Sequence, residues 1–106
     1  ELGMSESEAN SDGWRGTDEG TQLKSTYGWY DGGNGTDNVG FSALPGGYRY
    51  YNGSFYNAGS GGYWWSSSPS GGNAWARYLF IYSPGISRDF NDPRVGFSVR
   101  CLRDAD

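Results

Sequence analysis

Residues 61–68 read GGYWWSSS, and this stretch sets the main constraint on how the chain folds. Side chains alternate between the two faces of an extended strand, so Trp64 and Trp65 must point to opposite faces. We expect one of the two indole rings to pack into the core. The other ring then serves as a ligand platform, as a second packing surface or as a contact with another chain.

The composition predicts a single domain over residues 1–106. Hydrophobic residues make up 35% of the sequence, and 9 Tyr, 5 Trp and 5 Phe supply much of the apolar surface because Leu, Ile and Val are few. We therefore expect an aromatic core. The 19 glycines would suit a disordered chain, but disordered chains are poor in aromatic residues. A folded domain with long glycine-rich loops fits both observations.

The charge balance argues against two classes of partner. The net charge is −4 and Lys24 is the single lysine, whereas nucleic-acid binding needs clustered cations to neutralise phosphates. No apolar run approaches the ~20 residues of a membrane-spanning helix, so we expect no membrane insertion. The arginines are spread among acidic residues, and we expect them to pair with Asp or with loop carbonyls.

Short apolar runs separated by Gly, Asn, Ser and Pro predict short strands and turns. The strongest predicted strand covers residues 74–82, and the next covers residues 95–102, with Phe97, Val99 and Cys101 on one face. Residues 1–12 give the best helical signal, although Gly3 weakens it. Helix signals nearly vanish after Trp14.

The residue inventory argues against an enzyme. The sequence has no His, which removes the commonest general base and metal ligand. Cys101 is the single cysteine, and no His is present to activate it as a nucleophile. We therefore predict no catalytic residues.

The loop DGGNGTDN, residues 31–38, is the one candidate metal site. Carboxylate and amide oxygens on a flexible loop suit calcium, and calcium is the one cofactor that the sequence suggests. The spacing differs from that of an EF-hand, and the same residues are ordinary turn formers. We favour a solvated turn over a calcium site with the ligands Asp31, Asn34, Asp37 and Asn38.

Aromatic residues cluster between positions 48 and 65, more densely than a small core can absorb. Flat rings beside Asn and Ser can stack on sugar rings, and the same residue types anchor protein interfaces. We expect most of these rings to pack the loops and a minority to reach the surface. The candidate ligand-binding residues are Tyr50, Tyr51, Tyr56, Tyr63, Trp64 and Trp65.

Four phrases, WRGTDEGTQLKS, GFSALPGGYR, GGYWWSSS and SRDFNDPRVGFSVRCLRD, together resemble the Fibrobacter succinogenes major paralogous domain of secreted and surface bacterial proteins. The resemblance runs from Leu2 to Asp104. The closing GFSVR also resembles the last strand of formylglycine-generating-enzyme-type domains, which have a C-type-lectin-like fold. The resemblance implies a β-rich α+β domain with a short N-terminal helix, a small twisted antiparallel sheet and long glycine- and aromatic-rich loops.

The chain departs from that family at its start. Family members usually carry a further N-terminal segment with a first strand, and the resemblance suggests that this segment holds the usual partner of Cys101. We therefore expect a C-terminal portion of a lectin-like domain, which another chain completes. The edge of the last strand would then expose Phe97, Val99 or Leu102.

Two functions remain open. The first is a non-catalytic extracellular or bacterial cell-surface module that recognises a glycan or a surface protein through exposed aromatic loops. The second is a structural subunit of a surface fibre or sheath, which assembles with copies of itself or with other chains. The two differ in whether the extra aromatic rings face solvent or lie between subunits.

Overall fold

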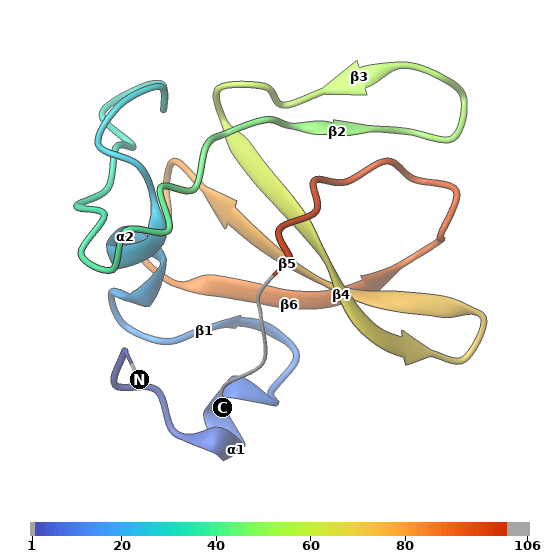
Figure 1. Ribbon diagram of the computed structural model, residues 1–106, viewed down its shortest axis with the longest axis horizontal. Coiled ribbons are helices and arrows are strands. Elements are labelled where there is room, and N and C mark those ends of the chain that lie inside the picture. The colour runs from blue at the N-terminus through green and yellow to red at the C-terminus, as the bar shows by residue number, and fades with distance from the viewer. Residues whose placement is uncertain (1, 102–106) are drawn as a thin grey trace.

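The computed structural model describes residues 2–101, and it shows a strand-rich domain with two short helices in that range (Figure 1). This confirms the prediction of a β-rich domain with a small antiparallel sheet and few helices. None of the described helices is long and apolar enough to cross a membrane. In chain order the elements are α1 (Glu6–Ala9), β1 (Gly13–Arg15), α2 (Glu19–Leu23), β2 (Tyr48–Arg49), β3 (Phe55–Tyr56), β4 (Gly61–Ser70), β5 (Asn73–Phe80) and β6 (Ile86–Asn91).

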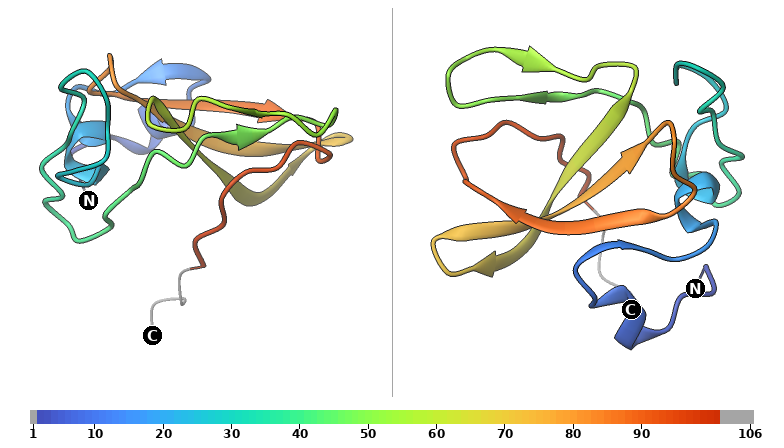
Figure 2. Two further views of the ribbon diagram at one scale, coloured as in Figure 1. Left: turned by 90° about the horizontal axis from the view of Figure 1, so that it is seen from above. Right: turned by 180° about the vertical axis from the view of Figure 1, so that it is seen from behind.

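Four of these strands form one antiparallel sheet in the order β1-β6-β5-β4. The register pairs Tyr63 with Tyr78 and Trp64 with Arg77, and it is interrupted by a bulge between Trp65 and Pro69. Strands β2 and β3 form a separate hairpin. Figure 2 shows that the hairpin leads into the beginning of β4, and a bridge between Gly47, just before β2, and Gly62 of β4 joins the two.

The predicted strand at residues 74–82 is present as β5, close to its expected limits. The second predicted strand, residues 95–102, is wrong as a regular strand. Gly96 pairs with Arg49 of the hairpin, whereas Ser98 pairs with Trp64 of β4. A regular strand needs one continuous partner. This segment instead joins the hairpin to the sheet by two isolated bridges, and Leu102 lies outside the described residues.

The helical prediction for residues 1–12 holds only in part. Helix α1 is four residues long, and Ser5 caps it by accepting a hydrogen bond from the Glu8 amide at 3.2 Å. The sequence analysis missed α2. Its first residue, Glu19, is buried, and its carboxylate accepts hydrogen bonds from the amides of Thr17 and Asp18. These hydrogen bonds stabilise the turn before the helix. They leave no apolar repeat in the sequence by which the helix could have been predicted.

The core on one face of the sheet centres on Trp29, Ala43 and Leu79, with Trp64 and Phe41 packed against it. Trp64 and Trp65 point to opposite faces, as the alternation predicts, because Trp64 contacts Phe41 and Trp65 contacts Phe97. Trp64 packs against the core, as expected for one of the two rings, and Trp65 forms a second packing surface with Phe97. Both indoles are half-buried within their own chain, because loops cover both faces of β4.

Lys24 connects α2 to the rest of the domain. Its ammonium is buried and donates hydrogen bonds to the carbonyls of Phe80 at 2.8 Å and Ser83 at 3.1 Å. It also lies 5.3 Å from the centre of the Trp29 ring. Burial lowers the pKa of Lys24. The charge is tolerated because carbonyl oxygens and an aromatic face replace part of its hydration shell.

Helix α2 packs so closely against the turn before β6 that one added methyl group at Gly20 should destabilise the fold. A Cβ atom at Gly20 would overlap the carbonyl oxygen of Gly85, which is backbone and cannot rotate away. We expect Gly20→Ala to lower the free energy of unfolding in urea by about 1–3 kcal/mol, the usual cost of overpacking. Gly72→Ala is the matched control, because no atom lies within 4 Å of that Cβ position. Equal stability of the two variants would contradict the packing of α2 described here.

Candidate functional site

A pocket of about 180 Å³ lies on the face of the sheet opposite Leu79. Tyr63 and Tyr78 project into it from paired positions of β4 and β5. Tyr48 and Tyr50, at the β2 end of the hairpin, form another part of its wall. Asn57, Asn91, Val95 and Phe97 complete the lining. We call this site the tyrosine pocket.

Ring-to-ring contacts fix the aromatic wall. The centroid of Tyr48 lies 4.9 Å from that of Tyr63 and 5.4 Å from that of Tyr56. Phe97 stacks on Tyr63 at 5.4 Å and meets Tyr78 edge-on at 5.7 Å. Offset stacked and edge-to-face pairs are the arrangements that the ring quadrupoles favour. The rings therefore hold one another in place even though they come from β2, β3, β4, β5 and the segment after β6.

Two asparagine–tyrosine pairs supply the polar groups of the pocket. The Asn57 amide donates a hydrogen bond to the Tyr63 hydroxyl at 2.7 Å, and the Asn91 amide donates one to the Tyr78 hydroxyl at 3.4 Å. Burial raises the pKa of Tyr63 to about 12 and also raises the pKa of Tyr78. Both phenols are therefore neutral near pH 7, and each keeps an O–H that can donate.

The structure brings only part of the predicted ligand-binding set to this pocket. Tyr50 and Tyr63 line it, although Tyr63 is 6% exposed, so the expectation of an exposed ring is wrong there. Tyr51 and Tyr56 are exposed, and both contact Tyr50. Trp64 and Trp65 do not line this pocket; both border a cavity that also includes Leu79.

Sequence reasoning missed Tyr78, Asn57 and Asn91 as lining residues, and it did not select Tyr48. The alternation of side chains along β5 could have identified Tyr78, because it places Tyr78 on the face opposite Leu79. Nothing in the pattern marks Asn57 or Asn91, since asparagine is common in the turns of this chain. Their role depends on the pairing of β5 with β6 and on the turn after β3.

In the loop at residues 31–38, two of the four predicted calcium ligands bind other parts of the protein through their side chains. The side chain of Asn34 accepts a hydrogen bond from the Trp29 amide, and Asp37 accepts one from the Ser42 amide at 2.7 Å. The bonds from Ser42 lower the pKa of Asp37. Within residues 2–101, no group of three or more His, Cys, Asp or Glu side chains could hold a metal ion. Calcium binding by Asp31, Asn34, Asp37 and Asn38 stays a prediction.

The sequence model of the Fibrobacter succinogenes major domain matches residues 1–103. No curated protein and no solved structure matches the chain.

The raised pKa of Tyr63 predicts a loss of stability at alkaline pH. The folded state favours the neutral phenol, whose pKa is about 12 against an ordinary value of 10.0. The stabilisation is therefore complete below about pH 10 and is lost as the pH rises toward 12. We expect Tyr63→Phe to reduce this alkaline loss in urea unfolding followed from pH 9 to pH 12 in steps of about one unit.

The control for this titration is Tyr27→Phe, which removes a phenol that is 65% exposed and is not among the groups that raise the pKa of Tyr63. It should leave the alkaline loss of stability unchanged. A Tyr63→Phe variant with the same pH dependence as the unmodified chain would show that the Tyr63 phenol does not cause the loss.

Proposed function

We propose that this chain, which belongs to the Fibrobacter succinogenes major domain family, is a non-catalytic module that binds a neutral sugar ring of a glycan in the tyrosine pocket. The observation that carries the proposal is the composition of that pocket, four tyrosines and two asparagines around one cavity. An extracellular or bacterial cell-surface location is part of the same proposal, since surface glycans are found there.

The aromatic wall supports a ring-shaped ligand. A pyranose ring presents C–H groups on its flat faces, and these pack well on the negative face of an aromatic ring. Tyr48, Tyr50 and Phe97 are the aromatic lining residues that we assign to this packing. The cavity volume of about 180 Å³ is below the ~300–1,000 Å³ of pockets for drug-sized ligands, so a single ring fits the site better than a large ligand.

The polar groups support a neutral and hydroxyl-rich ligand. The phenols of Tyr63 and Tyr78 can each donate one hydrogen bond, and the side-chain carbonyls of Asn57 and Asn91 can accept. Sugar hydroxyls both donate and accept, so they satisfy this mixed set. No charged side chain is among the described residues that line the pocket.

The proposal includes two finer assignments. A small antiparallel sheet with long loops supports the C-type-lectin-like architecture that the family resemblance implies. The absence of His from the sequence supports a binding role over catalysis. Cys101 is exposed and lies away from the tyrosine pocket lining, so the proposal gives it no part in sugar binding.

Titration with neutral monosaccharides tests the proposal. Glucose, galactose, mannose and N-acetylglucosamine would be added to the labelled protein, and amide chemical shifts would be followed by NMR. At least one sugar should shift amides around Tyr48, Asn57 and Val95 with a dissociation constant of about 1 mM, since one ring offers few contacts. No saturable shift with any of the four would contradict the proposal.

Two variants localise the binding. Tyr50→Ala should weaken binding by about tenfold through loss of a stacking face, and Tyr78→Phe by several-fold through loss of one hydrogen bond. The matched control is Tyr82→Ala, because Tyr82 is an exposed tyrosine that does not line the pocket. If Tyr82→Ala weakened sugar binding as much as Tyr50→Ala does, the sugar would bind outside the tyrosine pocket.

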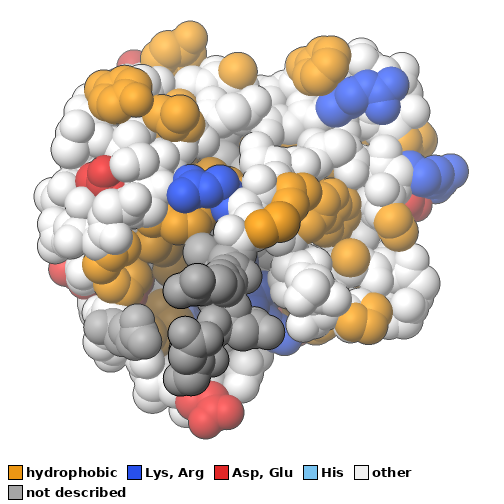
Figure 3. Space-filling model, in the orientation of Figure 1, with side chains coloured by type: hydrophobic (Ala, Val, Ile, Leu, Met, Phe, Trp, Pro, Cys, Tyr) orange, Lys and Arg blue, Asp and Glu red, His pale blue; other side chains and the backbone are white. Residues whose placement is uncertain are grey.

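A second candidate function, self-assembly as a structural subunit, is favoured by exposed apolar groups near one sheet edge. Val99 is 65% exposed and follows Ser98, which bridges the edge strand β4. Among the described residues, β4 beyond Trp65 pairs only with β5. Figure 3 shows hydrophobic side chains in several patches over this face of the molecule. An open edge beside apolar groups can accept a strand from another chain.

Light scattering tests self-assembly. If this function holds, the average mass should exceed that of one chain at micromolar concentration, and Val99→Lys should return it to one chain because edge lysines block strand addition. Val39→Lys is the matched control, because Val39 is also an exposed valine but lies outside the sheet. A uniform mass of one chain for the unmodified protein would rule this function out.

A further inference from the structure

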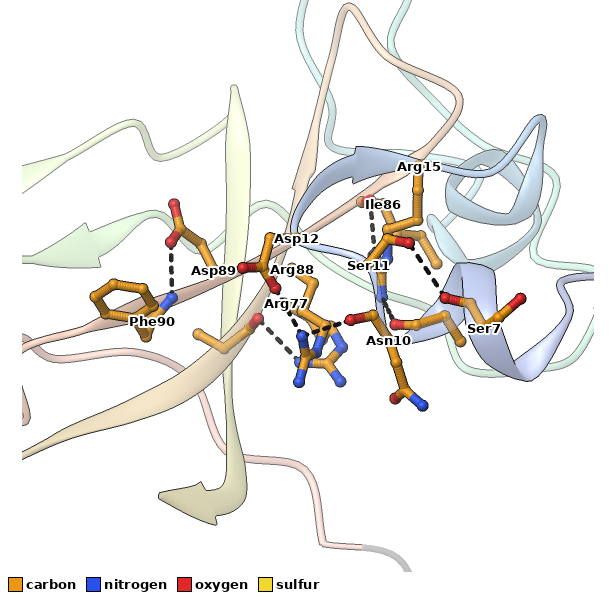
Figure 4. Close-up of polar contacts among 12 residues, drawn as sticks. Ser7, Asn10, Ser11, Asp12, Arg15, Arg77, Ile86, Arg88, Asp89 and Phe90 are labelled. Carbon is orange, nitrogen blue, oxygen red and sulfur yellow. Dashed lines mark hydrogen bonds and ion pairs between the residues drawn. The ribbon is translucent and has the colours of Figure 1, made fainter. Parts of the chain in front are cut away.

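Three adjacent strands each place an arginine on the same face of the sheet. Arg77 of β5 pairs directly with Arg88 of β6, and Arg88 pairs with Gly13 of β1, two residues before Arg15. Residues two apart on a strand share a face, so Arg15, Arg88 and Arg77 form a row across the sheet. Figure 4 shows the side chains of Arg77 and Arg88 together, with Asp12 next to them.

Two of these arginines border a cavity of about 300 Å³, and Arg100 lines it as well. The rest of the lining is apolar and includes Phe41, Trp64 and Leu79. We call this site the arginine pocket. It lies on the opposite face of the sheet from the tyrosine pocket, because Arg77 and Leu79 alternate with Tyr78 along β5.

The row of arginines is only partly neutralised. Arg88 pairs with Asp12 at 2.8 Å, and its guanidinium lies 3.8 Å from the Trp75 ring centre. Among residues 2–101 the other ion pair is Arg94 with Asp92, so no ion pair there involves a pocket arginine. An acidic protein with a net charge of −4 therefore carries a concentrated positive site on this face.

The hydrogen bonds of the pocket arginines go mainly to carbonyl groups. Arg15 donates to the carbonyls of Ile86 at 2.6 Å and Ala9 at 3.1 Å, and its buried Nε has no partner within the described part of the chain. Arg77 donates through Nη1 to its neighbour, the Ala76 carbonyl, at 3.2 Å. Nε and Nη2 of Arg77 form no hydrogen bond with the described residues, so within that part of the chain these N–H groups keep their capacity to donate.

Burial and mutual repulsion act on the same two arginines. Burial lowers the pKa of Arg15, and the charges of Arg77 and Arg88 lower it further, against smaller effects of Glu8 and Glu19. Burial and Arg88 lower the pKa of Arg77. Both side chains still carry a charge at neutral pH, since an arginine is not deprotonated in proteins. An anion in the pocket would relieve this repulsion.

We infer that the arginine pocket binds an organic carboxylate attached to an apolar or ring-shaped body. The planar guanidinium of Arg77 matches the two oxygens of a carboxylate, and Arg100 at the exposed rim adds a second positive charge. The apolar wall of Phe41, Trp64 and Leu79 would hold the body of the ligand. This site is independent of the proposed sugar site, because the two pockets use opposite faces of the sheet.

Calorimetric titration of the full chain with phenylacetate, at low ionic strength, tests the inference. Phenylacetate should bind at least about tenfold more tightly than phenylacetamide, which has the same shape without the charge, and more tightly than acetate, which lacks the body. Added salt should weaken phenylacetate binding, because it screens the charges. Equal binding of phenylacetate and phenylacetamide, or no binding of either, would overturn the inference.

A further arm separates two sources of carboxylate. Glucuronate binding that exceeds glucose binding about tenfold would identify the ligand as a sugar acid and would support the carboxylate site. If the protein bound glucose and glucuronate equally and did not bind phenylacetate, the carboxylate site would be ruled out. Failure of the sugar proposal leaves this test intact, since phenylacetate does not depend on the tyrosine pocket.

Arg77→Met keeps an unbranched apolar stem and removes the charged guanidinium, so it should weaken phenylacetate binding about tenfold or more. Arg49→Met is the matched control, because it makes the same change at an exposed arginine outside the pocket. Near-ultraviolet circular dichroism would establish that Arg77→Met folds. If it does not, Arg100→Met at the rim replaces it and should weaken binding several-fold. An equal loss with Arg49→Met would overturn the inference.

Discussion

The buried ammonium of Lys24 is the interaction on which the arrangement of the loops depends. It holds the carbonyls of Phe80 and Ser83 and lies over the Trp29 ring, so it fixes α2 against the turn that follows β5. Its backbone also pairs with Ala43, and its carbonyl accepts a hydrogen bond from the Asp37 amide. A chain with few aliphatic residues cannot hold long loops by apolar burial alone. Here one charge and a set of backbone hydrogen bonds hold the loop that covers the sheet.

The paired strands β4 and β5 serve both candidate sites. Tyr63 and Tyr78 face the tyrosine pocket, whereas Trp64, Arg77 and Leu79 face the core and the arginine pocket. On each face, residues of the loops or of the hairpin complete the lining beside these two strands, Tyr48 and Asn57 at the tyrosine pocket and Phe41 at the arginine pocket.

The pattern of the sequence predicted β5 well and the C-terminal segment poorly, for a physical reason. Residues 73–80 form a nearly continuous run of apolar and aromatic side chains, because β5 pairs with a strand on each side and is partly buried on both faces, so the run identifies a strand. Residues 95–101 alternate, but Val95 is buried whereas Val99 is exposed, because the segment crosses from the hairpin to β4 instead of following one partner. Helix α2 carries no apolar repeat, since Glu19, Gly20 and Lys24 are held by polar or close backbone contacts.

The sequence alone determined the strand-rich class, the opposite directions of Trp64 and Trp65, the aromatic character of the core and the family. All four can be read from composition, from alternation along a strand or from ordered motifs, which are properties of the sequence itself. The tertiary structure decided which rings meet. Tyr48, Tyr63, Tyr78 and Phe97 come from four segments, and only the strand pairing and the bridges at Gly96 and Ser98 bring them together. The same holds for Arg15, Arg77 and Arg88, whose shared row depends on the antiparallel register of β1, β6 and β5. Contacts between residues that are distant in sequence depend on how the strands pair and how the loops pack, and no local sequence pattern specifies this.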